Sequence, residues 1–500
     1  MKYESFSEGL GSKRESKNEN LILSILVIGI LMASIDSTIV LLAFPAITQA
    51  LHSNLSTIIW VILIYLLVTA VAATQLGRIG DLFGKSRVFN SGIAIFTVFS
   101  FMCGIAPTDI TLIIFRSFQA IGGAMMTANS GAIIADTFKR EKLGKAYGFT
   151  GMGWNVGAML GIVLGGVITT FIGYRYIFFI NVPIGIVLLA LAFKYIKDDK
   201  RENEKLDIIG MGLLGAALSM ILYAGVRIAS VGLDLIDIPV LLIGFLLFVP
   251  FYFRESTFEN PVVKFSMFKN KVFSNSVLAS MFQGLGFMGV AFMLIMYLQG
   301  VRGLSPFDAS LLLLPGYILS GVLSPFMGRY SDKYGARLLA TLGLIVMIAG
   351  ISVYFALNAT SSVYIVLIGS AITGIGGSMF WPANNSAVMK SSEAGRFGTA
   401  SGILRLFGSI GIMGSFIIVI VAATLAIPRY LAFEIFVGTS KLIGGIAGGF
   451  INGMHFSFIF LIIMLVIAAL LSLTRGNENK RGEEHQTMGQ IEAKTLARRT

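Results

Sequence analysis

Two charged side chains lie inside long apolar stretches of this sequence, where a charge is expensive to bury. Asp36 falls within the apolar run 21–43, ~10 Å from the end of that run if it is helical. Arg116 lies at a similar depth, ~9 Å, inside the run 110–134. A carboxylate that is costly to ionise is a candidate proton carrier, and an arginine nearby can hold it in its charged form. We interpret Asp36 and Arg116 as a switchable proton-coupling pair; a permanent structural salt bridge is the alternative.

A second candidate site is a short polar loop that occurs twice. The segment 77–87 reads GRIGDLFGKSR, and its core GRxxDxxG returns about 250 positions later, at 328–335, again followed by an arginine. A carboxylate at a helix end can cap a neighbouring helix or pair with a base. We interpret the loop as a conformational latch, with topological anchoring by its basic residues as the alternative. The latch residues are Gly77, Arg78, Asp81, Gly84 and Arg87, with Asp332 in the second copy.

The composition indicates that these residues belong to an integral membrane protein. Hydrophobic residues make up 55% of the 500 positions and charged residues 13%, and the mean hydropathy is +0.83. Apolar runs of about 20 residues, each long enough to cross a bilayer as a helix, recur along the chain. The fourteen predicted spans lie near 21–43, 56–76, 88–106, 110–134, 146–170, 176–195, 207–229, 238–253, 273–298, 307–327, 338–357, 363–388, 397–425 and 455–474.

The distribution of basic residues predicts the orientation. Most of the 38 Lys and Arg residues fall on the side of the membrane that carries the N-terminus. The loops of the other side hold Arg175, Arg227, Arg302, Arg429 and Lys441. This asymmetry predicts that both termini are cytoplasmic, in a multi-pass protein of the cell membrane. The net charge of +12 is explained by this arrangement, so we expect no nucleic-acid partner.

The internal repeat divides the chain into two halves. Matches at nearly the same offset also join Ile121–Met125 to Ile375–Met379, so spans one to six pair with spans nine to fourteen. The predicted division is a tail (1–20), a six-helix bundle (21–196), a linker with two inserted spans (197–271), a second six-helix bundle (272–474) and a second tail (475–500). The apolar, Gly-rich segment 428–454 is expected to cover the outer face, as a hairpin, a short helix or a flexible loop.

The motifs resemble those of one known family. GRIGDLFGKSR resembles the cytoplasmic loop motif of the major facilitator superfamily, and residues 20–475 resemble its fourteen-span drug/proton antiporter branch. Asp36-Ser37-Thr38 fits its first span, Arg116 with Gln119 its fourth, and the segment 177–185 the start of its sixth. The resemblance implies the major facilitator fold, and implies that the N-terminal copy of the latch dominates. Leu82 departs from the family loop, which usually has a basic residue there.

Span five carries small residues at helical spacing. Gly157, Gly161, Gly165 and Gly166 resemble the antiporter motif of the family, although Ile162 stands where a proline is usual. Residues of this size let two helices approach closely, so packing without any role in transport direction is an equal alternative.

The substrate cavity is predicted from residues on paired spans. Aromatic, Met and amide side chains there would form a wall suited to bulky apolar or cationic molecules, although lipid-facing or packing roles remain open for each aromatic residue. The predicted cavity residues are Trp60, Tyr65, Gln119, Met125, Asn129, Phe380, Trp381 and Asn385. Arg405, ~12 Å inside span thirteen, could bind an anionic group, but we expect it to snorkel to the inner surface.

These observations predict a proton-coupled exporter of hydrophobic or cationic small molecules, of the multidrug efflux type, that works by alternating access. A more selective carrier of a metabolite, amino acid or lipid precursor is the alternative. An enzyme is not expected, because the chain has no P-loop and no Ser/His/Asp arrangement on its aqueous loops. A metal site is not expected either, since the three His residues are scattered. The expected partners are a small molecule, protons and lipid; we expect a monomer, driven by the proton gradient without a cofactor.

Overall fold

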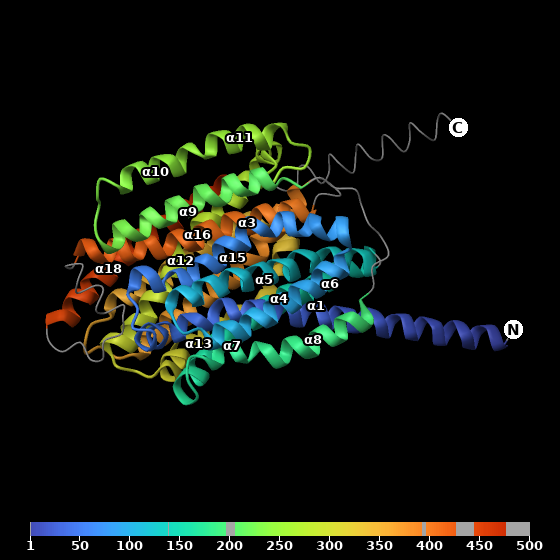
Figure 1. Ribbon diagram of the computed structural model, residues 1–500, viewed down its shortest axis with the longest axis horizontal. Helices are drawn as coiled ribbons and strands as arrows, with labels where there is room; N and C mark the ends of the chain where they lie inside the picture. The colour runs from blue at the N-terminus through green and yellow to red at the C-terminus, as the bar shows by residue number, and fades with distance from the viewer. Residues whose placement is uncertain (1, 139, 197–205, 393–396, 427–444, 477–500) are drawn as a thin grey trace.

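The computed structural model describes residues 2–138, 140–196, 206–392, 397–426 and 445–476, and within these ranges the chain is almost entirely helical, without β-strands. Fourteen segments are long and apolar enough to cross a membrane, which confirms the predicted number. The long helices lie side by side in one bundle (Figure 1). Because fourteen is an even number, the first span begins and the last span ends on the same side. We call this the terminal side of the bundle and the other the opposite side.

The first half of the chain supplies six spans, the second and sixth of which each combine two helices. Its helices are α1 (Lys2–Ala50), α2 (Leu55–Ile58), α3 (Trp60–Phe83), α4 (Lys85–Ile105), α5 (Asp109–Thr137), α6 (Arg140–Phe171), α7 (Tyr176–Phe179) and α8 (Asn181–Tyr195).

The first helix is longer at both ends than the sequence predicted. It begins at Lys2, so the segment 1–20, expected to be a tail, is a helical extension that projects from the bundle (Figure 1). Its other end passes Pro45 and reaches Ala50. A proline is tolerated inside a membrane helix because neighbouring groups can satisfy the freed carbonyl. Asp36 therefore lies near the middle of the span Glu19–Ala50, and not close to its end.

The second half supplies the last six spans. Its helices are α12 (Lys271–Met296), the π-helical turn η2 (Tyr297–Val301), α13 (Pro306–Tyr334), α14 (Ala336–Val353), the short 3₁₀ turn η3 (Tyr354–Ala356), α15 (Tyr364–Ser391), α16 (Phe397–Ala426) and α18 (Gly445–Thr474). The last span begins at Gly448 and not near 455, so the end of the Gly-rich segment 428–454 belongs to a helix. Its earlier part and the tail from 477 lie outside the described residues.

The two halves repeat each other in backbone detail. Gly84 and Gly335 both adopt positive φ, 107° and 91°, where the polar loop turns into the next helix. A glycine is favoured at such a turn because other residues are strained there. A Cβ on Gly92 would lie 2.9 Å from the Gly122 carbonyl oxygen, and a Cβ on Gly343 would lie 2.7 Å from that of Gly376. The same helix pair is thus packed through equivalent glycines in each half.

Three further helices form the insertion between the halves: α9 (Ile208–Ser230), α10 (Asp237–Leu246) and α11 (Phe248–Thr257). They lie along one flank of the bundle, with α9 against it and α10 outside (Figure 1). A Cβ on Gly225 of α9 would lie 2.8 Å from Ile417 of α16, and one on Gly215 would lie 3.5 Å from Val71 of α3. The insertion therefore contacts both halves.

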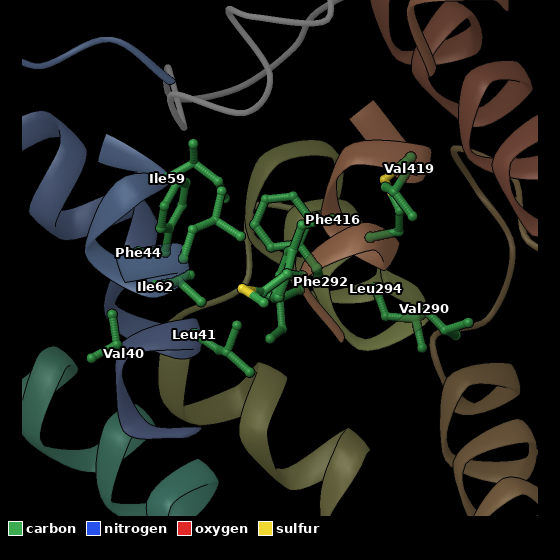
Figure 2. Close-up of a cluster of buried hydrophobic side chains, with 14 of the residues drawn as sticks. Val40, Leu41, Phe44, Ile59, Ile62, Val290, Phe292, Leu294, Phe416 and Val419 are labelled. Carbon is green, nitrogen blue, oxygen red and sulfur yellow. The ribbon is translucent and has the colours of Figure 1, made fainter. Parts of the chain in front are cut away.

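The two halves share one hydrophobic core on the opposite side of the bundle. Phe44 of α1 packs edge-on against Phe292 of α12 (5.6 Å), which packs against Phe416 of α16 (5.4 Å). Figure 2 shows these rings together with Ile59 and Ile62 from the first half. The Gln299 side-chain nitrogen also donates to the Leu42 carbonyl oxygen across the halves, at 3.2 Å.

Toward the terminal side the halves have separate cores. One cluster contains Leu26, Phe89 and Ile134 and belongs to the first half. Another contains Phe273 and Ile403 and belongs to the second. The halves therefore share apolar packing around Phe44 and Phe292, in a cluster that also reaches Ala336 and Leu339 at the start of α14, and each half has a smaller separate core in addition.

Candidate functional site

Asp36 lies at the centre of a buried polar network. Its side chain is fully buried in α1. One carboxylate oxygen accepts a hydrogen bond from Arg116 Nη1 at 2.5 Å. The other oxygen accepts from Gln119 Nε2 at 2.9 Å and from Asn181 Nδ2 at 3.2 Å. One oxygen thus has a donor from α5 and the other has donors from α5 and α8, so the carboxylate is compensated although it is shielded from water.

Arg116 is held from several directions. It is 1% exposed, and its Nε donates to the Val61 carbonyl oxygen at 3.3 Å. Its guanidinium carbon lies 4.3 Å from the centroid of the Tyr65 ring, a cation–π contact. Gln119 accepts from Arg116 Nη1 at 2.8 Å and donates to Ser100 Oγ at 2.6 Å. The predicted proximity of Asp36 and Arg116 is therefore observed, and Gln119 and Tyr65 join this network.

The glycines of span five place α6 directly against α1 around this network. A Cβ on Gly157 would lie 2.7 Å from Ser34 Cβ, and a Cβ on Gly161 would lie 2.0 Å from Thr38 Oγ1. A Cβ on Gly165 would lie 2.8 Å from the Ile39 carbonyl oxygen. Without these glycines, α6 could not lie so close to the helix that carries Asp36.

Gly166 faces the other half of the molecule. A Cβ there would lie 2.7 Å from the carbonyl oxygen of Pro306, the first residue of α13. Nearby, the Phe307 amide donates to Thr170 Oγ1 at 3.1 Å. The last glycine of the motif therefore belongs to the contact between the halves.

The other predicted cavity residues differ in burial. Asn129 is fully buried, and its amide donates to the Leu76 carbonyl oxygen at 3.1 Å, which joins α5 to α3. Phe380 is also fully buried, while Trp60, Met125 and Trp381 are half-buried and Asn385 is exposed. Their role in a substrate cavity stays a prediction.

The repeated loop contacts the linker that returns from the insertion. Arg78 donates from both terminal nitrogens, to the carbonyl oxygens of Asn260 and Pro261. Asp81 pairs with Lys85 at 3.4 Å, and Lys85 also pairs with Asp136 at the end of α5, at 2.8 Å. Gly77 lies within α3, and a Cβ added to it would lie 3.9 Å from the Ala128 Cβ. Arg87 is exposed. The side chain of Asp332 lies outside the described part of the structure.

Sequence reasoning missed several members of this site. Asn181 lies in the segment 177–185 that carries a family motif, so a signal for it existed, but its contact with Asp36 depends on a helix distant in sequence. Ser100 lies in an apolar helix without any motif. Among the described residues, no group of three or more His, Cys, Asp or Glu side chains could hold a metal ion.

The chain between residues 26 and 416 matches the family model described as Major Facilitator Superfamily. The protein belongs to this superfamily. It is therefore a membrane transporter and not an enzyme, and its fourteen spans are those of a major facilitator fold with two inserted spans.

Relatives within the superfamily carry out several kinds of transport. The riboflavin transporter RibZ of Clostridioides difficile (strain 630) is 32% identical over 375 residues, covering 75% of this chain and 81% of RibZ. The tetracenomycin C resistance and export protein of Streptomyces glaucescens is 28% identical, covering 77% and 73%. The multidrug resistance protein Stp of Mycobacterium tuberculosis (strain CDC 1551 / Oshkosh) is 27% identical, covering 80% and 76%.

Solved structures share the fold at low sequence identity. A bacterial homologue of the human lysosomal transporter Spinster, in an inward-facing, unoccupied conformation, has a TM-score of 0.65 at 17% identity, covering 92% of this chain and 97% of that one. A D-xylose–proton symporter has a TM-score of 0.63 at 14% identity, covering 92% and 98%.

Proposed function

We propose that this transporter exports hydrophobic small molecules in exchange for protons, by alternating access to a site between its halves. The observation that carries the proposal is the ion pair between Asp36 and Arg116, buried in the middle of the membrane. Ionisable residues at this depth are costly and commonly mark ion or proton pathways. The names of the tetracenomycin C export protein and of Stp support export of small molecules by such a chain.

The coupling follows from the two states of the carboxylate. While Arg116 contacts Asp36, the charge is compensated and the carboxylate has no need of a proton. When the halves rock and this contact lengthens, an ionised Asp36 would lie uncompensated in a medium of low dielectric constant, so it takes up a proton. Because α6 packs on α1 through glycines and touches α13 at Gly166, movement of the halves can be transmitted to the helix that carries Asp36.

The conformation described here is then the one that opens toward the terminal side. We assign that side to the cytoplasm, because most Lys and Arg residues of the sequence fall there. The shared core around Phe44, Phe292 and Phe416 would close the outer side. Proton uptake in the alternate, outward-open state is driven by the membrane proton gradient, with no cofactor and with the monomer as the working unit.

Cationic substrates have less support than hydrophobic ones. Asp36 is the buried carboxylate that a cation would bind among the described residues of the first six spans. Its oxygens already accept hydrogen bonds from Arg116, Gln119 and Asn181. A cation would have to displace these donors, whereas a hydrophobic molecule does not compete for them.

The test uses purified protein in proteoliposomes with an imposed pH gradient and a pH-sensitive dye inside. A panel of ethidium, riboflavin and anthracene carboxylate is added in turn. We expect at least one hydrophobic compound to collapse the gradient faster in proteoliposomes than in empty liposomes. Transport of a compound at equal rates with and without a pH gradient would show that the carrier is not coupled to protons.

A selective carrier is the second candidate, and one observation favours it. RibZ, named as a riboflavin transporter, is 32% identical across 75% of this chain. If riboflavin alone among many hydrophobic compounds is transported, the selective function replaces multidrug export while proton coupling stays a separate question.

A further inference from the structure

A second arginine lies inside the membrane, and among the described residues no carboxylate pairs with it. Arg405 lies on α16, ~9 Å inside the span Thr399–Thr424. Among the described residues it takes part in no ion pair and no side-chain hydrogen bond, unlike Arg116. An uncompensated charge at this depth is expensive, and such residues are commonly retained for function.

The side chain of Arg405 points across to the other half of the molecule. Its guanidinium carbon lies 5.6 Å from the centroid of the Trp154 ring on α6. Trp154 lies ~8 Å inside its own span, which begins at Phe149, so the two residues are at nearly equal depth. The contact therefore runs sideways between the halves. The expectation that Arg405 snorkels to the inner surface is not what the structure shows, because Trp154 offers the guanidinium a lateral partner.

Both side chains remain accessible although they lie between the halves. Trp154 is 40% exposed, and Arg405 is exposed as well. Gly151, one turn before Trp154 on α6, has no atom within 4 Å of where its Cβ would stand. The position one turn from the Trp154 ring on α6 is thus open.

We propose that Arg405 and Trp154 form a substrate subsite for planar aromatic molecules that carry a carboxylate or similar acidic group. The ring of the ligand stacks on the indole of Trp154, and its acidic group accepts hydrogen bonds from the guanidinium. Arg116 already pairs with Asp36, so of these two arginines it is Arg405 whose charge is available to a ligand. The subsite rests on the proposed export function and narrows its substrate class.

The physical basis is a charge match between the guanidinium and the acidic group of the ligand. A guanidinium presents a planar fork of donors that fits a carboxylate, and a hydrogen bond between charged groups is stronger than a neutral one. Removing the charge should weaken binding of an acidic ligand about ten- to a hundredfold. The same charge repels an ammonium group on an otherwise identical ring.

The test measures equilibrium binding to the purified full-length protein, without any pH gradient. The two probes are anthracene carboxylate and anthracene methylammonium, which share a ring and differ in charge. The variants are Arg405→Gln and Arg405→Lys, which remove and keep the charge, and Trp154→Phe and Trp154→Leu, which keep and remove a ring. The hydrogen bond from Ser34 to Trp154 involves the backbone carbonyl oxygen, so it survives either change of side chain.

We expect the wild type to bind the carboxylate probe more tightly than the ammonium probe. Arg405→Gln should lose that preference while Arg405→Lys retains most of it, and Trp154→Leu should weaken both probes more than Trp154→Phe does. Equal loss of both probes in Arg405→Gln, or no loss of either, would overturn the proposal. If Arg405→Gln does not fold, the preference of the wild type decides: equal affinity for the two probes refutes the subsite. Because no transport is measured, failure of proton coupling leaves this result interpretable.

Discussion

Replacing Arg116 with glutamine tests whether the buried ion pair is compensated as the structure indicates. The change removes the cation that lies 2.5 Å from Asp36 and leaves only the amides of Gln119 and Asn181 as donors. Removing one partner of a buried ion pair costs about 3–5 kcal/mol, because the remaining charge is left uncompensated. The loss should be greatest near neutral pH and smaller at acidic pH, where protonation of Asp36 removes the uncompensated charge.

The assay is thermal unfolding of the purified protein over a pH series. A double-mutant cycle adds Asp36→Asn and the double variant Asp36→Asn/Arg116→Gln. The double variant should recover most of the lost stability, because it buries no charge at this position. Arg405→Gln is the matched control: it removes an arginine at a membrane depth comparable to that of Arg116, but one that pairs with no carboxylate among the described residues. Its unfolding temperature should depend little on pH.

Two results would contradict this reasoning. The first is that Arg116→Gln unfolds at the wild-type temperature at neutral pH, which would mean that the cation does not compensate Asp36. Alternatively, the losses of the two single variants could simply add in the double variant. Additive losses would mean that the residues are not coupled, despite their contact.

Two further predictions concern packing and the latch. Gly161→Ala should lower stability and slow transport, because its Cβ would lie 2.0 Å from Thr38 Oγ1. Gly212→Ala on the inserted helix α9 meets open space and should be neutral, so equal effects of the two changes in unfolding and transport assays would exclude the packing role. Asp81→Asn should raise the access of cysteine reagents to positions between the halves from the terminal side, and Asp332→Asn should do so less. Unchanged labelling in Asp81→Asn would favour mere topological anchoring.

The sequence predicted the parts of the fold that depend on regular patterns. Apolar runs of membrane length yield the fourteen spans, and the repeated loop identifies the two halves. The turn at Gly84 and its counterpart at Gly335 both have positive φ, a backbone conformation that glycine adopts without strain, so the repeated glycine predicts the repeated turn. The predicted span 21–43 starts close to the observed one but stops short of its end, because α1 continues through Pro45 to Ala50 and a proline is tolerated inside a membrane helix.

The sequence predicted the centre of the site better than its surroundings. Asp36 and Arg116 could be paired because depth within a span can be counted along a helix. Which face a side chain occupies depends on neighbouring helices, so the burial of Asn129 and the direction of Arg405 could not be derived in this way. The contact of Arg78 with Asn260 and Pro261 joins segments that no pattern connects.

The central claim is that Asp36 carries the coupled proton, and exchange in proteoliposomes tests it most directly. Asp36→Asn is compared with wild type and with Asp234→Asn, a matched change at an exposed position in the turn between α9 and α10. The account predicts that Asp36→Asn folds and binds substrate but no longer exchanges substrate for protons, while Asp234→Asn behaves as wild type. Wild-type proton/substrate exchange by Asp36→Asn would contradict the account.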